Sequence, residues 1–220
     1  MRPIYVLEKD CSHDGVATAE QVRRVFGNRA IERIDPAQLP WDSLKESAAL
    51  YVFAKENNVI QPDGSVLNWI TPEREKALYD YVTQGGSVLF LHNGLVSFPE
   101  NSLWHQMAGG IFVRHPVIRP VKYSPLAVNH PILEGVEPFE GEDEQYFCNV
   151  RLGEVHLIMG GYSAGDGCSI AGWYRTLGKG RIVSLTPGHT VEIVSQKSLC
   201  RLIRNAASWA TGEDFPEIEG

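Results

Sequence analysis

Histidines follow two of the short apolar runs in this sequence, at points where buried strands are expected to end. His92 comes directly after the run Ser87 to Leu91, and His189 follows a run at Arg181 to Leu185. An imidazole can donate, accept or transfer a proton near neutral pH. Ligands bind open α/β sheets at the carboxyl ends of the strands, so both histidines lie where a site is expected.

Further polar residues occupy similar positions and complete the candidate set. They are Asn93, next to the first histidine; Asp143 and Glu144, in an acidic loop; Tyr146, whose ring can wall a pocket; and His13, after the first predicted strand. Carboxylates and imidazoles together can perform acid/base chemistry or hold a divalent metal. A solvated loop side chain is the alternative at each position, and we favour it for His13. Of the remaining histidines, His105 and His156 are expected to be structural or exposed, His130 to lie in a turn and His115 in an extended segment.

A buried strand at Ser87 to Leu91 is the element that would position this site. Gly85 and Gly86 can end the helix before it, because glycine adopts the left-handed conformation that closes helices. The predicted elements upstream are a strand at 3–7, a helix from the capping box at Thr18, strands at 30–34 and 48–54, a polar flap at 56–70, and a helix from Thr71-Pro72-Glu73. Such alternation predicts parallel strands with right-handed crossovers.

The pattern changes after His92 and predicts mostly extended segments. They are a short helix at 101–108, extended runs at 111–113 and 117–128, an acidic loop at 140–146, strands at 155–159, 169–175 and 181–185, and a last helix at 195–210 that Gly212 ends. Turns are expected at Gly160-Gly161, at Gly165 to Gly167 and, as a tight hairpin, at Leu177 to Gly180. Residues 213–220 are expected to form a frayed acidic tail.

Composition narrows the class of protein. The 220 residues carry a net charge of −7, which argues against a nucleic-acid partner, and no stretch approaches the length of a membrane span. The four cysteines form no CxxC pair, so a zinc ribbon is not expected. We expect one domain over residues 1–212, a cytoplasmic location, and a chain that could assemble as a homo-oligomer. No Walker or dinucleotide-binding glycine motif occurs.

The strand and sharp turn around His92 have the layout of a nucleophile elbow, but the tip carries histidine in place of serine or cysteine. His189 and Glu192 faintly match the His and Glu of a Cys-His-Glu triad, which would here lack its thiol. A glutaminase activity is therefore disfavoured.

Several longer stretches resemble the ThuA-like family, named for trehalose utilisation and related in fold to class I glutamine amidotransferases. They are YVTQGGSVLFLHNG at 81–94, WHQMAGGIFVRHP at 104–116, NHPILEGVEPFEGEDEQYF at 129–147, WYRTLGKGRIVSLTPGHT at 173–190 and RNAASWATG at 204–212. The resemblance implies a flavodoxin-like α/β three-layer sandwich with a mostly parallel sheet and an added β-rich portion. It also implies carbohydrate metabolism. The positions that carry over are His92, His115, Asp143, Glu144, Tyr146 and His189.

Two hypotheses of function follow. The first is an enzyme that acts on a keto sugar or a disaccharide derivative by isomerisation, elimination or hydrolysis. Glu144 would be its base if the pocket desolvates it, while His92 or His189 would polarise the carbonyl or protonate the leaving oxygen. A divalent metal could serve as the Lewis acid instead. The second is a sugar-binding or assembly module without catalysis. No cofactor is certain from the sequence, and His13, Asn93, Asp143, Tyr146 and His115 are the expected substrate contacts.

Overall fold

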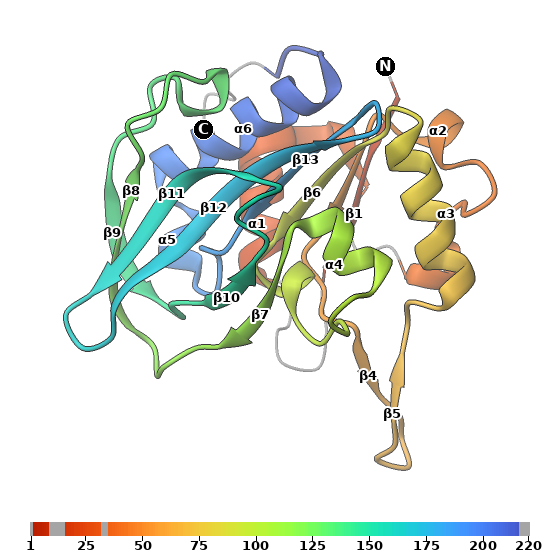
Figure 1. Ribbon diagram of the computed structural model, residues 1–220, viewed down its shortest axis with the longest axis horizontal. Coiled ribbons are helices and arrows are strands. Elements are labelled where there is room, and N and C mark those ends of the chain that lie inside the picture. The colour runs from red at the N-terminus through yellow and green to blue at the C-terminus, as the bar shows by residue number, and fades with distance from the viewer. Residues whose placement is uncertain (1, 9–15, 32–34, 216–220) are drawn as a thin grey trace.

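A nine-stranded sheet runs through the computed structural model, which describes residues 2–8, 16–31 and 35–215 (Figure 1). The strands are β1 (Ile4–Leu7), β2 (Ala30–Ile31), β3 (Leu50–Phe53), β4 (Asn58–Ile60), β5 (Val66–Asn68), β6 (Ser87–Leu91), β7 (Gly110–Arg114), β8 (Arg119–Pro125), β9 (Phe139–Asp143), β10 (Phe147–Val150), β11 (His156–Ser163), β12 (Gly167–Leu177) and β13 (Gly180–Leu185). The helices are α1 (Val16–Phe26), α2 (Leu44–Ser47), α3 (Pro72–Thr83), α4 (Leu103–Ala108), α5 (Val191–Val194) and α6 (Lys197–Thr211).

The strand order is β2-β1-β3-β6-β13-β12-β11-β8-β9. Neighbours from β2 to β13 are parallel, and neighbours from β13 to β9 are antiparallel. The first half is the α/β part predicted from the alternation of strands and helices, and the second half is the added β-rich portion. Strand β6 is buried along its whole length between β3 and β13, which confirms that it is a central strand.

Alternate side chains of the strands enter two separate cores. In β3, Leu50 and Val52 pack in a core with α1 and α6, whereas Tyr51 and Phe53 pack in a core with α3 and α4. Both faces of the parallel half are therefore covered by helices, which gives the three layers seen in Figure 1. This confirms the expected three-layer sandwich.

Two sequence signals for helix ends, the start of α3 at Thr71 and the end of α6 at Gly212, are confirmed. The Thr71 hydroxyl accepts a hydrogen bond from the backbone N–H of Arg74 at 3.3 Å, and Pro72 is the first residue of α3. Gly212, with φ +73°, ends α6 in the left-handed conformation. Among the described residues, no helix combines the length and the apolar character needed to cross a bilayer.

Three local predictions are wrong. Helix α1 begins at Val16, so Thr18 lies inside it and cannot cap it. The acidic segment 140–146 is not all loop: Phe139, Gly141 and Asp143 face inward along β9, and the acidic residues between them face outward. Gly160-Gly161 lies within β11, where a Cβ at Gly161 would come within 2.9 Å of the Ser169 hydroxyl. Glycine is required there for close packing and not for a turn.

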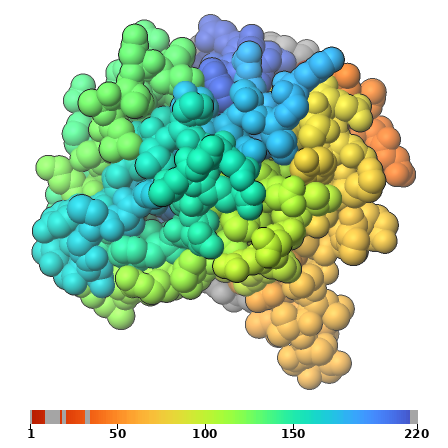
Figure 2. Space-filling model, viewed as in Figure 1, coloured from red at the N-terminus to blue at the C-terminus, as the bar shows by residue number. Residues whose placement is uncertain are grey.

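Two other predicted segments, the C-terminal tail and residues 56–70, contain more structure than expected. Of the predicted frayed tail, Phe215 is buried against Phe26 and Glu213 pairs with Arg29, while residues 216–220 lie outside the described part. The segment 56–70 contains the hairpin β4–β5, which projects from the body of the molecule (Figure 2). The second predicted strand is described only as Ala30–Ile31.

Candidate functional site

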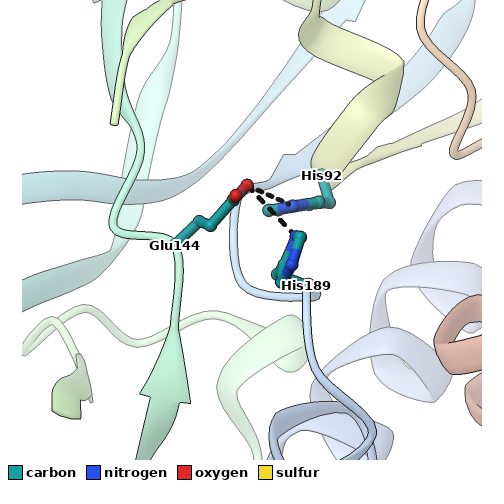
Figure 3. Close-up of side chains that lie close together, drawn as sticks. All are labelled: His92, Glu144 and His189. Atoms are coloured by element: carbon teal, nitrogen blue, oxygen red, sulfur yellow. Dashed lines mark ion pairs between the residues drawn. The ribbon is translucent and has the colours of Figure 1, made fainter. Parts of the chain in front are cut away.

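Three side chains far apart in the sequence meet at the carboxyl ends of the strands. Glu144 Oε2 lies 3.1 Å from His189 Nδ1 and 3.5 Å from His92 Nε2 (Figure 3). The facing atoms of all three residues lie within 4.8 Å of one another. The convergence of these three candidates, inferred from their positions after predicted strands, is present in the structure.

Curling of the sheet makes this meeting possible. His92 follows β6 and Glu144 follows β9, five places away in the strand order. Neighbouring strands lie about 4.8 Å apart, so a flat sheet would separate these two strands by about 24 Å. The antiparallel half must therefore bend back, so that its edge strand β9 approaches the ends of β6 and β13. Sequence patterns contain no signal for this curl.

His92 is held in one orientation by contacts on two sides. Its Nδ1 atom lies 2.7 Å from the carbonyl oxygen of Thr186, which can only accept, so Nδ1 carries the proton. Its Nε2 atom is then the ring atom that faces Glu144, at 3.5 Å. The ring stacks on Tyr146, with centroids 4.1 Å apart. The backbone of His92 has φ +41°, an uncommon conformation for a residue other than glycine and a frequent feature of functional sites.

Asp143 lies behind the site and shapes it. Its side chain is fully buried and accepts hydrogen bonds from the Tyr123 hydroxyl at 2.8 Å and from the backbone N–H groups of Gly188 and His189 at 3.2 and 2.8 Å. Burial raises the pKa of this carboxyl, against the opposing effect of the nearby His92 and of these hydrogen bonds. Because protein groups surround both oxygens, Asp143 fixes the loop that carries His189.

Glu144 and His189 shift each other's pKa values in opposite directions. Burial alone would raise the pKa of Glu144, but hydrogen bonds and charge from His189 and His92 hold that pKa below its usual range. The hydrogen bond to Glu144 raises the pKa of His189, although burial opposes this. Burial in this pocket therefore does not raise the pKa of Glu144, the condition on which its role as the base was predicted. A carboxylate with a lowered pKa is suited to stabilise a charged histidine.

A small pocket of about 120 Å³ opens beside these three residues. Its lining residues are Glu56, Asn93, Val96, Phe112, His115, Glu144, Tyr146 and His189. Pockets for drug-sized ligands are usually about 300–1,000 Å³, so this one fits a single ring or one end of a larger molecule. His115 belongs to the site, since its Nδ1 lies 3.6 Å from Glu144 Oε1.

Three residues that line the pocket, Glu56, Val96 and Phe112, were not predicted from the sequence. Glu56 follows β3, and the rule that selected His92 and His189 could also have selected it. Phe112 lies within β7 and packs on Tyr146 at 4.5 Å between centroids, a contact with no pattern in the sequence. His13 lies outside the described residues.

Two tryptophans near the site belong to the core. Trp104 and Trp173 are fully buried, and their indole N–H groups donate to the backbone carbonyls of Gly94 and Ala108. Tyr146 is also buried, but it lines the pocket. The geometry thus offers an aromatic wall, two carboxylates from Glu56 and Glu144 in the pocket lining, and imidazoles that can move protons or bind a metal.

Solved structures with the same fold share little sequence with this chain. A ThuA-like protein from Parabacteroides merdae superposes with a TM-score of 0.75 at 13% identity, covering 99% of this chain and 93% of that one. A ThuA-like protein from Bacteroides uniformis gives 0.69 at 17% identity, covering 94% and 91%. A cytoplasmic protein from Salmonella typhimurium gives 0.66 at 11% identity, covering 96% and 99%.

No curated protein matches the chain. A family model does: the one named ThuA and described as trehalose utilisation matches residues 4–210. Because that match spans nearly all of the sequence, the chain belongs to the ThuA family.

Proposed function

We propose that this chain is a carbohydrate-processing enzyme that acts on a keto sugar or a keto-disaccharide by proton transfer. The observation that carries the proposal is the meeting of His92, Glu144 and His189 beside a pocket with an aromatic wall. The family description, trehalose utilisation, supports a carbohydrate as the substrate class. We also propose that the protein acts in the cytoplasm, as the name of the Salmonella protein of the same fold suggests.

The chemistry follows from the acidity of a C–H bond next to a carbonyl. Its proton must be removed and returned elsewhere, either to the neighbouring carbon in an isomerisation or to the departing glycosidic oxygen in an elimination. His189 is the residue we propose for this transfer. Its Nδ1 faces Glu144, which leaves Nε2 as the ring atom for the substrate. Glu144 holds the ring in place and stabilises its charged form.

The pocket supplies groups for the rest of the sugar. The Asn93 amide can donate to the carbonyl oxygen, and Tyr146 and Phe112 offer ring faces against which a sugar can pack. Glu56 is a second carboxylate suited to sugar hydroxyls. The small volume favours one sugar ring inside and the leaving group towards solvent.

Incubation of the purified protein with a panel of 3-keto-glycosides, followed by mass spectrometry of the products, tests the proposal. Turnover should fall by at least about 100-fold in His189→Ala and Glu144→Gln, as is usual for loss of an acid/base residue. The exposed His156 gives a matched control, His156→Ala, which should keep the wild-type rate.

The same panel of 3-keto-glycosides distinguishes the proposed enzyme from the alternative, a protein that binds sugar without catalysis. Saturable binding of a keto sugar in calorimetry without any product would favour a binding module. Wild-type turnover in both site variants would remove these residues from the reaction. Glutamine should not be hydrolysed, since none of the residues lining the pocket is a cysteine or a serine.

A further inference from the structure

We infer that His92, Glu144 and His189 bind one divalent transition-metal ion, of the Zn²⁺, Mn²⁺ or Co²⁺ type. The inference deepens the proposed function, because it concerns the occupant of the same site. Its test measures binding and not turnover, so the two can fail independently.

The spacing of the donor atoms is close to that of a coordination shell. Metal–nitrogen and metal–oxygen bonds of about 2.0–2.2 Å place neighbouring ligands about 3.0–3.5 Å apart in octahedral or tetrahedral geometry. Glu144 Oε2 lies 3.1 Å from His189 Nδ1 and 3.5 Å from His92 Nε2, and the three facing atoms span no more than 4.8 Å (Figure 3). Small side-chain rotations would place an ion within reach of all three.

The tautomer of His92 is already the one that a metal requires. The Thr186 carbonyl oxygen, 2.7 Å from Nδ1, fixes a ring proton on that nitrogen and leaves Nε2 as the atom that faces the cluster and would coordinate an ion. A backbone carbonyl on the far nitrogen is the usual outer partner of a histidine ligand. Since this contact lies outside the cluster, it is an independent indication that Nε2 receives a cation.

An outer contact also restrains His189. Its backbone N–H donates to Asp143 at 2.8 Å, which fixes the segment that carries the ring. Ligands held in this way lose little entropy when an ion binds. The strained backbone of His92, with φ +41°, is consistent with a position fixed for a ligand-binding role.

The types of ligand atom indicate which metal ions the site would bind and what such an ion would do there. Two imidazole nitrogens and one carboxylate oxygen suit Zn²⁺, Mn²⁺, Fe²⁺ or Co²⁺ better than Mg²⁺ or Ca²⁺, which prefer oxygen ligands. Three protein ligands leave positions open towards the pocket, as in catalytic and not structural metal sites. An ion there would polarise a substrate carbonyl, and His189 would still present Nε2–H to the substrate.

The test uses full-length protein without an affinity tag, stripped of metal with a chelator. Calorimetry with Zn²⁺ or Mn²⁺ alone, and the visible absorption of added Co²⁺, should show one ion per chain. Glu144→Gln and His189→Ala should each weaken binding by at least about tenfold. His156→Ala, which alters an exposed histidine outside the cluster, should bind as the wild type does.

Circular dichroism of each metal-free variant establishes that it is folded before binding is measured. Binding of one ion that both site substitutions weaken supports the inference. No binding by the wild type, or binding that neither substitution changes, overturns it. Turnover of a keto sugar by a protein that binds no ion in calorimetry would overturn the inference and keep the proposed enzyme; metal binding without turnover would do the reverse.

Discussion

Asp143 Oδ1 accepts a hydrogen bond from the backbone N–H of His189 at 2.8 Å, and the next residue, Glu144, faces the imidazole of the same histidine. Two adjacent carboxylates thus fix one residue, the first through its backbone and the second through its ring. Asp143 is fully buried, whereas Glu144 borders the pocket. Positioning and chemistry are therefore divided between neighbours in the sequence.

Asp143→Asn should destabilise the protein by about 1–3 kcal/mol, the usual penalty for mispaired buried polar groups. The new amide would place N–H groups against a backbone donor, from Gly188 or His189. Urea unfolding measures the loss. The neighbouring Glu142 is exposed, and Glu142→Gln is the matched control that should leave stability unchanged. Equal stability in both variants would show that Asp143 does not hold the loop.

Glu56→Gln should weaken binding of the carbohydrate by about tenfold, because a charged acceptor contributes about 1.5–3 kcal/mol to a hydrogen bond. Calorimetry with an inactive His189→Ala background allows binding to be measured without turnover. The Ser97 hydroxyl donates to Glu56 at 3.4 Å and accepts from the Asn58 amide at 2.9 Å, so Ser97→Ala removes these two internal contacts and keeps the Glu56 carboxylate. If Ser97→Ala reproduced the loss, Glu56 would act through protein structure and not through the ligand.

Gly94→Ala should destabilise the fold by about 1–3 kcal/mol, the range for overpacking a filled core. A Cβ at this position would lie 2.0 Å from the carbonyl oxygen of Phe53. It would also disturb the carbonyl that accepts from Trp104. Gly153→Ala is the control, since nothing lies within 4 Å of its added Cβ. Thermal unfolding of the two variants should differ clearly, and similar midpoints would contradict the packing observed at Gly94.

Truncation after Gly212 should lower stability by about 2 kcal/mol, the value for burying one phenylalanine side chain. The lost groups are Phe215, which packs on Phe26, and Glu213, which pairs with Arg29. Truncation after Phe215 retains these contacts and serves as the reference. Urea unfolding that gave identical midpoints for the two truncations would show that residues 213–215 behave as the frayed tail expected from composition.

The sequence predicted the structural features whose signals lie in neighbouring residues. The cap at Thr71, the stop at Gly212 and the all-buried run of β6 follow from neighbouring residues, and each is found in place. The positions of His92 and His189 also follow, since each comes after a parallel strand. Glu144 was selected only as part of an acidic stretch, because its approach depends on the curl of the antiparallel half.

Two further features depend on tertiary contacts and could not be predicted from the sequence. The low pKa of Glu144 arises from histidines that are distant in sequence, so desolvation alone gave the wrong direction. Gly160 and Gly161 lie in a strand, where a Cβ at Gly161 would come within 2.9 Å of the Ser169 hydroxyl and 3.2 Å of the Tyr123 ring, contacts that turn preferences do not report. In both cases the deciding neighbours belong to other elements.

The outer edge of β9 is covered by the segment that carries His189. The Thr190 hydroxyl donates to the Glu142 carbonyl at 2.6 Å, and the Gln196 amide donates to the Glu140 carbonyl at 3.3 Å. Uncovered strand edges recruit strands from other molecules and start aggregation. A substitution that detaches this segment would therefore do more than disrupt the cluster: it would expose β9 as an edge through which chains can polymerise.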